Sequence, residues 1–234
     1  MNTAYSVPGS LPVAQVGVEA RAQFITRTYV HLLGAIVGFV ALEYLFFTTG
    51  MAQTILGALT SVNWLFVLGA FMLASWLASR LADSVDSQAM QYVGLALLVT
   101  ANAVIFVLPL AIAQASFPGV IQSAALVTLV AFSGLTWFVF TTRKDFSFMG
   151  SILAWIGIGA LVLIAAGVLF GFQLGVFFSV GMVIFAGAAI LYDTSNVLHH
   201  YPEDRYVAAS LQLFASVALL FWYVLRLFMT FGRD

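Results

Sequence analysis

Seven long apolar runs constrain the fold of this chain more than any other feature of its sequence. A helix needs roughly 20 consecutive apolar residues to cross the hydrocarbon core of a bilayer. The runs are long and continuous rather than short and alternating, so they predict helices rather than barrel strands. They lie at about residues 29–49, 62–82, 90–112, 119–141, 147–170, 173–194 and 206–230. We therefore expect an all-α, polytopic membrane protein built as a seven-transmembrane-helix bundle.

The charge content excludes several other classes of protein. Only 7% of the residues are charged, whereas a typical soluble domain has about 25%. The 8 basic and 9 acidic residues give a net charge of -1, so there is no basic excess to neutralise phosphates and nucleic acid is not an expected partner. The absence of cysteine excludes disulfides, thiolate metal sites and cysteine nucleophiles. The lipid bilayer is the partner that this composition predicts.

The predicted spans also suggest how the chain is divided. The first 20 residues contain Gly, Pro and Ser but lack the basic start and apolar stretch of a signal peptide, so we expect a short disordered tail there. Connections between the later spans are short. We therefore expect residues 1–28 to form a cytoplasmic N-terminal tail and residues 29–234 a single transmembrane domain.

The distribution of basic residues predicts the orientation in the membrane. The predicted loops 50–61, 113–118 and 171–172 carry no charge. Six of the eight basic residues fall on the opposite side, which the positive-inside rule makes cytoplasmic: Arg21, Arg27, Arg80, Arg143, Lys144 and Arg205. Arg226 and Arg233 fall on the far side, and Arg226 could extend its guanidinium to the interface. The expected topology has the N-terminus in the cytoplasm and the C-terminus outside it.

Ionisable groups inside spans are energetically unfavourable and are candidate functional sites. Asp193 lies near the cytoplasmic end of the sixth span, and Arg80 lies near the same end of the second. Glu43 lies about 14 residues into the first span, which at 1.5 Å per residue is roughly 21 Å deep.

Each acid has two interpretations. Asp193 and the Thr and Ser that follow it would form a good N-cap for a short cytoplasmic helix. Held at the mouth of the bundle, with or without Arg80, the same carboxylate would form a proton-sensitive latch. Glu43 is as readily a buried acid hydrogen-bonded to a Ser or Asn as an acid on a conduction path.

The remaining polar residues give weaker signals. His199 and His200 precede Glu203 and Asp204 in the last cytoplasmic loop, where a solvated polar loop is the default interpretation. Adjacent histidines point in different directions on a helix, which makes metal chelation a weak expectation, although histidine can sense pH near neutrality. The chain contains no Gly-x-Ser-x-Gly, His-Glu-x-x-His or P-loop motif, so we do not expect an enzyme or a bound cofactor.

Two stretches resemble the Bax inhibitor 1 family, also called the TMBIM or lifeguard proteins. The first is Phe-Thr-Thr-Arg-Lys-Asp-Phe-Ser-Phe-Met-Gly at 140–150, and the second runs from Ala-Ile-Leu-Tyr-Asp-Thr-Ser-Asn at 189–196 through the seventh span to Arg233 and Asp234. The likeness is greatest to the proteobacterial branch, which includes the inner-membrane modulator of the protease FtsH. The resemblance implies a seven-helix bundle with the last helix at its centre.

The resemblance also implies roles for particular residues. Some members of the family are proposed to leak calcium under pH control, through an aspartate in span six paired with one in span seven and an arginine in span two that latches the closed state. Asp193 matches the first aspartate, Ser216 occupies the place of the second, and Arg80 is a positional candidate for the latch. A serine can hydrogen-bond Asp193 but cannot share its charge, and one carboxylate with one hydroxyl is a poor calcium site.

Three functions follow as hypotheses. The first is a bacterial inner-membrane regulator of membrane-protein quality control that acts on an FtsH-type protease, which could grip the N-terminal tail. The second is a pH-sensitive leak for calcium, as a transported ion, or another cation, gated around Asp193, Ser216, Arg80 and Glu43. The third is a stress-response scaffold with neither activity. The acid missing at Ser216 favours the first.

Overall fold

The computed structural model describes residues 12–84 and 87–232 of the chain. In these residues the secondary structure is helical, with one isolated backbone bridge. Seven helices are long and apolar enough to cross a membrane, which confirms the predicted number of spans. They are α1 (Val18–Thr49), α3 (Trp64–Ala82), α4 (Gln88–Ser116), α5 (Val120–Thr142), α6 (Met149–Phe170), α7 (Val176–His199) and α8 (Tyr206–Phe231).

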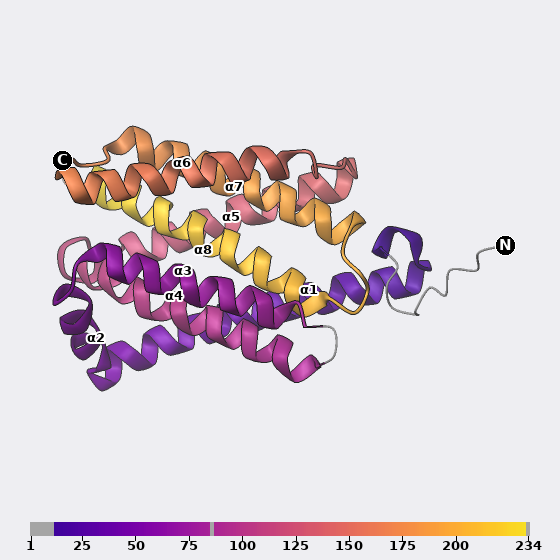
Figure 1. Ribbon diagram of the computed structural model, residues 1–234, viewed down its shortest axis with the longest axis horizontal. Coiled ribbons are helices and arrows are strands. Elements are labelled where there is room, and N and C mark those ends of the chain that lie inside the picture. The colour runs from indigo at the N-terminus through magenta and orange to yellow at the C-terminus, as the bar shows by residue number, and fades with distance from the viewer. Residues whose placement is uncertain (1–11, 85–86, 233–234) are drawn as a thin grey trace.

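The bundle has two ends, because consecutive long helices run in opposite directions (Figure 1). One end carries the start of α8 and the loops at 143–148 and 200–205, and we call it the motif end. The other end carries the short helix α2 (Met51–Thr60) and the loop at 171–175, and we call it the α2 end. These two names are used below without reference to the sides of a membrane.

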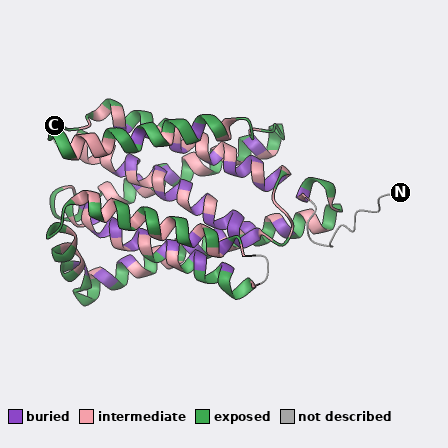
Figure 2. Cartoon of the chain, viewed as in Figure 1, coloured by how far each residue is buried: buried purple, intermediate pink, exposed green. Residues whose placement is uncertain are grey.

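Helix α8 is the centre of the bundle, as the resemblance implies. It packs against α1, α3, α4, α5 and α7, and buried residues follow it for most of its length (Figure 2). Helix α6 lies at the periphery, packs mainly on α7, and buries only Leu153 and Ala160. Apolar side chains that face lipid carry no energetic penalty, so α6 can leave most of its side chains exposed. Burial in this bundle therefore marks α8, the helix that the other helices surround.

The tight pairing of α3 with α4 depends on Gly94. A Cβ atom at this position would lie 2.5 Å from the backbone oxygen of Ala78 and 2.6 Å from the backbone nitrogen of Ala82. Real Cβ atoms do not approach backbone that closely, so a side chain here would separate the helices. Small residues commonly allow such close approach between membrane helices.

The structure differs from the expected tail at residues 1–28. Residues 1–11 lie outside the described residues, but from Pro12 onward the chain is packed against the bundle. A 3₁₀ turn (Val13–Gln15) fully buries Val13, whose backbone N–H donates to the carbonyl of Tyr201 at 2.8 Å. Helix α1 begins at Val18 and buries Phe24 and Thr28 on one face. Apolarity alone could not reveal this extension, because residues 18–28 are amphipathic rather than apolar.

The expected loop at 50–61 is also helical. Gly50 adopts a left-handed conformation (φ 82°), which ends α1 and turns the chain into α2. Helix α2 packs on α1 and α4 and buries Ala52. Its 10 residues are too few to cross a bilayer, which is why a search for long apolar runs does not find it.

Candidate functional site

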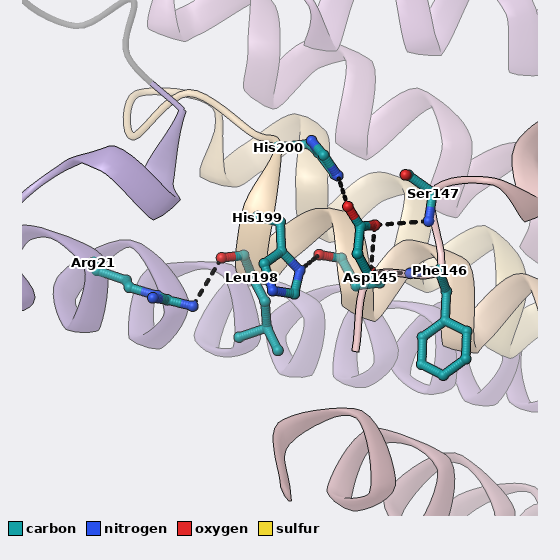
Figure 3. A network of polar contacts seen from close by, with 8 residues as sticks. Arg21, Asp145, Phe146, Ser147, Leu198, His199 and His200 are labelled. Atoms are coloured by element: carbon teal, nitrogen blue, oxygen red, sulfur yellow. Dashed lines mark hydrogen bonds and ion pairs between the residues drawn. The ribbon is translucent and has the colours of Figure 1, made fainter. Parts of the chain in front are cut away.

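The two segments that carry the family resemblance meet at the motif end. The loop between α5 and α6 lies against the last turns of α7, although the two are about fifty residues apart in sequence (Figure 3). The hydroxyl of Ser195 accepts a hydrogen bond from the Phe146 backbone N–H at 2.8 Å and donates to Asp145 Oδ1 at 3.4 Å. Asp145 Oδ1 also accepts from the Ser147 backbone N–H at 2.8 Å. Together with His200, we call these residues the motif network.

His200 completes the motif network at its exposed edge. Its Nε2 lies 3.0 Å from Asp145 Oδ2, and both side chains are about half exposed. The Ser147 backbone N–H, and to a smaller degree His200, lower the pKa of Asp145 to about 2. Asp145 is therefore ionised throughout the physiological pH range, and the charge on His200 decides whether the contact is an ion pair.

Further contacts attach the start of the chain to the end of α7. Arg21 donates to the carbonyl of Leu198 at 3.0 Å, and His199 Nδ1 lies 2.9 Å from the carbonyl of Ser195 (Figure 3). Tyr201, whose backbone carbonyl accepts the hydrogen bond from Val13, is half-buried, and desolvation raises the pKa of its phenol. The motif end is therefore a connected set of polar contacts among α1, α7 and the loop after α5.

Asp193 lies inside α7, two residues before the Ser195 of this network and further from the motif end. It is buried, and the hydroxyl of Ser216 on α8 donates to its Oδ2 at 2.5 Å. The hydrogen bond expected between these two residues is therefore present. The N-cap interpretation of Asp193 is wrong, because α7 continues to His199 and fully buries Thr194 and Ser195.

The structure does not bring Arg80 to Asp193. Arg80 is exposed, and its guanidinium lies 5.5 Å from the ring centroid of Trp76, one turn earlier on α3. Neither ion pair found among the described residues involves Arg80. The aromatic ring gives the guanidinium a cation–π partner on its own helix, so the shared depth of Arg80 and Asp193 is not sufficient for a contact. The latch role of Arg80 stays a prediction.

Glu43 lies in the opposite half of the bundle. It is about 9 Å along α1 from the helix end at Thr49, whereas Asp193 is about 9 Å along α7 from the motif end. Glu43 is buried, and neither of its carboxylate oxygens accepts a hydrogen bond from a described residue. The Ser or Asn partner considered for it is therefore not found. Phe39, Phe46 and Phe47, three or four residues from Glu43 on α1 and so on the same face of the helix, belong to an apolar cluster built from α1, α2 and α4.

Sequence reasoning missed the contact between His200 and Asp145. The described residues contain no group of three or more His, Asp or Glu side chains placed to hold a metal ion. The partner of His200 is a carboxylate 55 positions away, which spacing along one helix cannot predict. The available signal was that Asp145 and His200 each lie in or beside one of the two stretches that carry the resemblance.

This fold and these buried polar positions define a multi-pass membrane protein, a seven-helix bundle organised around its last helix. The sequence profile of the family described as "Inhibitor of apoptosis-promoting Bax1" matches residues 21–233. The chain therefore belongs to the Bax inhibitor 1 family.

Several curated proteins are similar to the chain. An uncharacterized protein of Pseudomonas aeruginosa is 36% identical over 118 residues, which cover 49% of this chain and 52% of that protein. Bax inhibitor 1 of Schizosaccharomyces pombe is 32% identical over 112 residues (46% and 41%). The modulator of FtsH protease YccA of Escherichia coli is 30% identical over 126 residues (52% and 55%). The chain spans about half the length of these curated relatives, and no solved structure matches it.

Proposed function

We propose that the chain is an inner-membrane regulator of membrane-protein quality control that modulates an FtsH-type protease. The name of the Escherichia coli relative supports this proposal, and other relatives are named as an inhibitor or an anti-apoptotic protein rather than as enzymes. The structural feature that supports the proposal is the motif network. It holds the charged loop at 143–145 in a fixed position at the surface of the bundle.

The charge distribution supports a cytoplasmic location for that loop. The motif end carries Arg143 and Lys144, the start of α1 with Arg21 and Arg27, and the connection with Arg205. By the positive-inside rule this end faces the cytoplasm, so the N-terminus is cytoplasmic and the C-terminus periplasmic. Arg143 and Lys144 are exposed, and they form the charged contact surface that we propose for the protease.

Co-purification and substrate turnover test the proposal together. The tagged full chain is expressed with the protease, and the half-life of a membrane substrate is measured with and without it. We expect co-purification and a slower turnover of the substrate, both weakened by Lys144→Glu. Gln53→Glu is the control for an added negative charge, at an exposed position on α2 at the opposite end. If the chain neither associates with the protease nor changes turnover, the proposal is wrong.

A pH-sensitive leak for calcium or another cation is the second candidate, and the buried pair of Asp193 and Ser216 favours it. A carboxylate between α7 and α8 would link proton binding to the packing of the central helix. Flux into liposomes that contain a calcium dye tests this function. We expect flux to depend on pH and to change in Asp193→Asn. A flux that is insensitive to both would exclude gating at this pair, and the absence of flux would exclude the leak.

A further inference from the structure

A groove runs along one side of α8, away from the motif network. It has a volume of about 740 Å³ and is lined by α3, α4, α6, α7 and α8. Its floor is a stripe of α8 residues spaced three or four apart, and these residues are half-buried in a mostly buried helix. The stripe consists of Gln212, Ala215, Leu219, Trp222 and Arg226.

The walls of the groove are apolar and open towards the lipid. Met72 on α3 and Leu161 on α6 line it from opposite sides, and both remain substantially exposed, at 48% and 40%. In Figure 1, α8 lies between the layer of α3 and α4 and the layer of α6 and α7. In a membrane, the apolar material that reaches such a lateral opening is the acyl chain of a lipid.

The polar groups of the groove are concentrated at its two ends. Gln212 and Arg226 are 14 residues apart, which is about 21 Å along α8 and roughly two thirds of the hydrocarbon core. Beside Gln212, towards the motif end, lie Ser75 and Ser79.

Asn102 lies about midway along the groove, one turn before the Phe106 ring that packs on Phe221 and Trp222, and its amide donates to the Leu98 carbonyl of its own helix. Apart from Asn102, whose amide is hydrogen-bonded within its own helix, the lining between the ends is mostly apolar. The apolar length of the groove therefore matches a hydrocarbon chain, and its polar terminus limits how far that chain can extend.

Arg226 provides a cation at the α2 end of the groove. Its Nη2 donates to the carbonyl of Leu174 at 2.7 Å, which engages one of the five N–H donors of a guanidinium. Within residues 12–84 and 87–232, no acidic side chain forms an ion pair with it. A charged group in a membrane helix normally has a charged or strongly polar partner, and a guanidinium is well matched to a phosphate.

The two tryptophans of the groove support the same orientation for a ligand. Trp64 is the first residue of α3 and Trp222 precedes Arg226 by one turn of α8, so both line the groove in its α2-end half. Tryptophan is enriched at the level of lipid headgroups, where its ring faces hydrocarbon and its N–H faces polar groups. A headgroup at Arg226 would therefore have aromatic neighbours at the depth where bilayers favour them.

We propose that this groove binds an anionic phospholipid from the bilayer, with one acyl chain along α8 and the phosphate at Arg226. A guanidinium can hold a lipid phosphate through two parallel charge-assisted hydrogen bonds. The groove separates the two tasks, because Arg226 recognises the charge while the walls from α3 and α6 hold the chain. The binding does not depend on the proposed action on a protease.

The test uses the full chain, purified in a mild detergent and depleted of lipid. Binding of dioleoyl phosphatidylglycerol, dioleoyl phosphatidylcholine and inorganic phosphate is measured by native mass spectrometry and by the shift of the unfolding temperature. We expect phosphatidylglycerol to bind more tightly than phosphatidylcholine and to raise the unfolding temperature. Arg226→Gln should weaken phosphatidylglycerol binding about tenfold, the loss of one charge-assisted contact, and leave phosphatidylcholine binding unchanged.

A second set of variants blocks the groove. Ala215→Trp fills its floor, and Gly157→Leu narrows it from the peripheral helix α6, where a Cβ atom would meet only an ordinary contact of 3.5 Å with Phe185. Both should weaken the binding of both lipids. Ala41→Trp on the exposed face of α1 and Lys144→Gln at the motif end are the matched controls and should bind both lipids as the unmodified chain does. If Ala215→Trp does not fold, Gly157→Leu decides the outcome.

Four results would overturn the proposal. Equal affinity for the two lipids, or unchanged phosphatidylglycerol binding in Arg226→Gln, would show that Arg226 does not recognise the headgroup. Unchanged binding in a folded groove-blocking variant would show that the chain lies elsewhere. Stabilisation by inorganic phosphate equal to that by phosphatidylglycerol would show an anion site without a lipid.

Discussion

Asp193 and Glu43 are both buried carboxylates in membrane helices, but their surroundings differ. Asp193 accepts a 2.5 Å hydrogen bond from Ser216 on the central helix and lies next to a connected polar network. Glu43 shares its face of α1 with residues of an apolar cluster formed with α2 and α4, and it accepts no hydrogen bond from a described residue. The first acid therefore contributes to the contact between α7 and α8, whereas the second is energetically unfavourable where it lies. Burial alone does not distinguish these two situations.

The largest expected effect comes from a second acid next to the first. Ser216→Asp would place two carboxylates within hydrogen-bond distance inside the bundle. We expect a loss of about 3–5 kcal/mol in the free energy of unfolding at pH 8, because an uncompensated buried charge is strongly destabilising. Unfolding by SDS in mixed micelles measures the loss. Ser216→Asn is the matched control, because asparagine has the size of aspartate, carries no charge and can still donate to Asp193. Equal losses of stability in the two variants would show that charge is not the cause.

Removal of the Ser216 hydroxyl should have a smaller effect on the free energy of unfolding. Ser216→Ala leaves Asp193 without its protein hydrogen bond, and we expect a loss of about 1–2 kcal/mol in the free energy of unfolding. Ser210→Ala is the control, because Ser210 is also buried but its hydroxyl donates to the Val207 carbonyl of its own helix. Unfolding in the same micelles should show the larger loss for Ser216→Ala. The reverse order would contradict the stabilising role of the contact between α7 and α8.

The same measurement at Glu43 should give a different result. Glu43→Gln removes the charge but no protein hydrogen bond, so we expect a change of less than about 1 kcal/mol in the free energy of unfolding. Glu43→Leu should stabilise the bundle, because an apolar side chain suits the cluster around Phe46 and Val107. A loss above about 2 kcal/mol in Glu43→Gln would mean that this carboxylate has a partner, and the contrast with Asp193 would disappear.

The smallest expected effect is at the surface. Asp145 has a lowered pKa, so the stability it contributes is complete above its ordinary pKa near 3.8 and is lost only as the pH falls through about 2. Asp145→Asn should lower the free energy of unfolding by less than about 1 kcal/mol, because the pair is exposed. Asp145 stays ionised between pH 5 and 8, so its own titration should not change this loss in that range. Hydrogen exchange at the Ser147 amide, which donates to Asp145, reports the local change. If the effect of Asp145→Asn changed between pH 5 and 8 even in a chain that also carries His200→Gln, Asp145 would not be ionised throughout that range.

The number of spans could be predicted from the sequence because bilayer thickness sets a length that few other structures satisfy. The extension of α1 and the helix α2 could not, because residues 18–28 are amphipathic and α2 has only 10 residues. At the candidate site, the hydrogen bond between Ser216 and Asp193 followed from alignment with the family pattern. The contact of His200 with Asp145 and the separation of Arg80 from Asp193 depend on how helices and loops pack in space, which spacing along the chain does not encode.

The short backbone pairing at the start of the chain has a mechanical consequence. The Val13 N–H donates to the Tyr201 carbonyl, which sets Pro12 opposite Pro202 and attaches the N-terminal segment to the connection between α7 and α8. Traction applied upstream of Pro12 would load this attachment before it reached α1. The force would therefore act first on the connection at 200–205, between the helices that carry Asp193 and Ser216. A protein that pulled on the N-terminal segment would load the central helix α8 before it unfolded the outer helices.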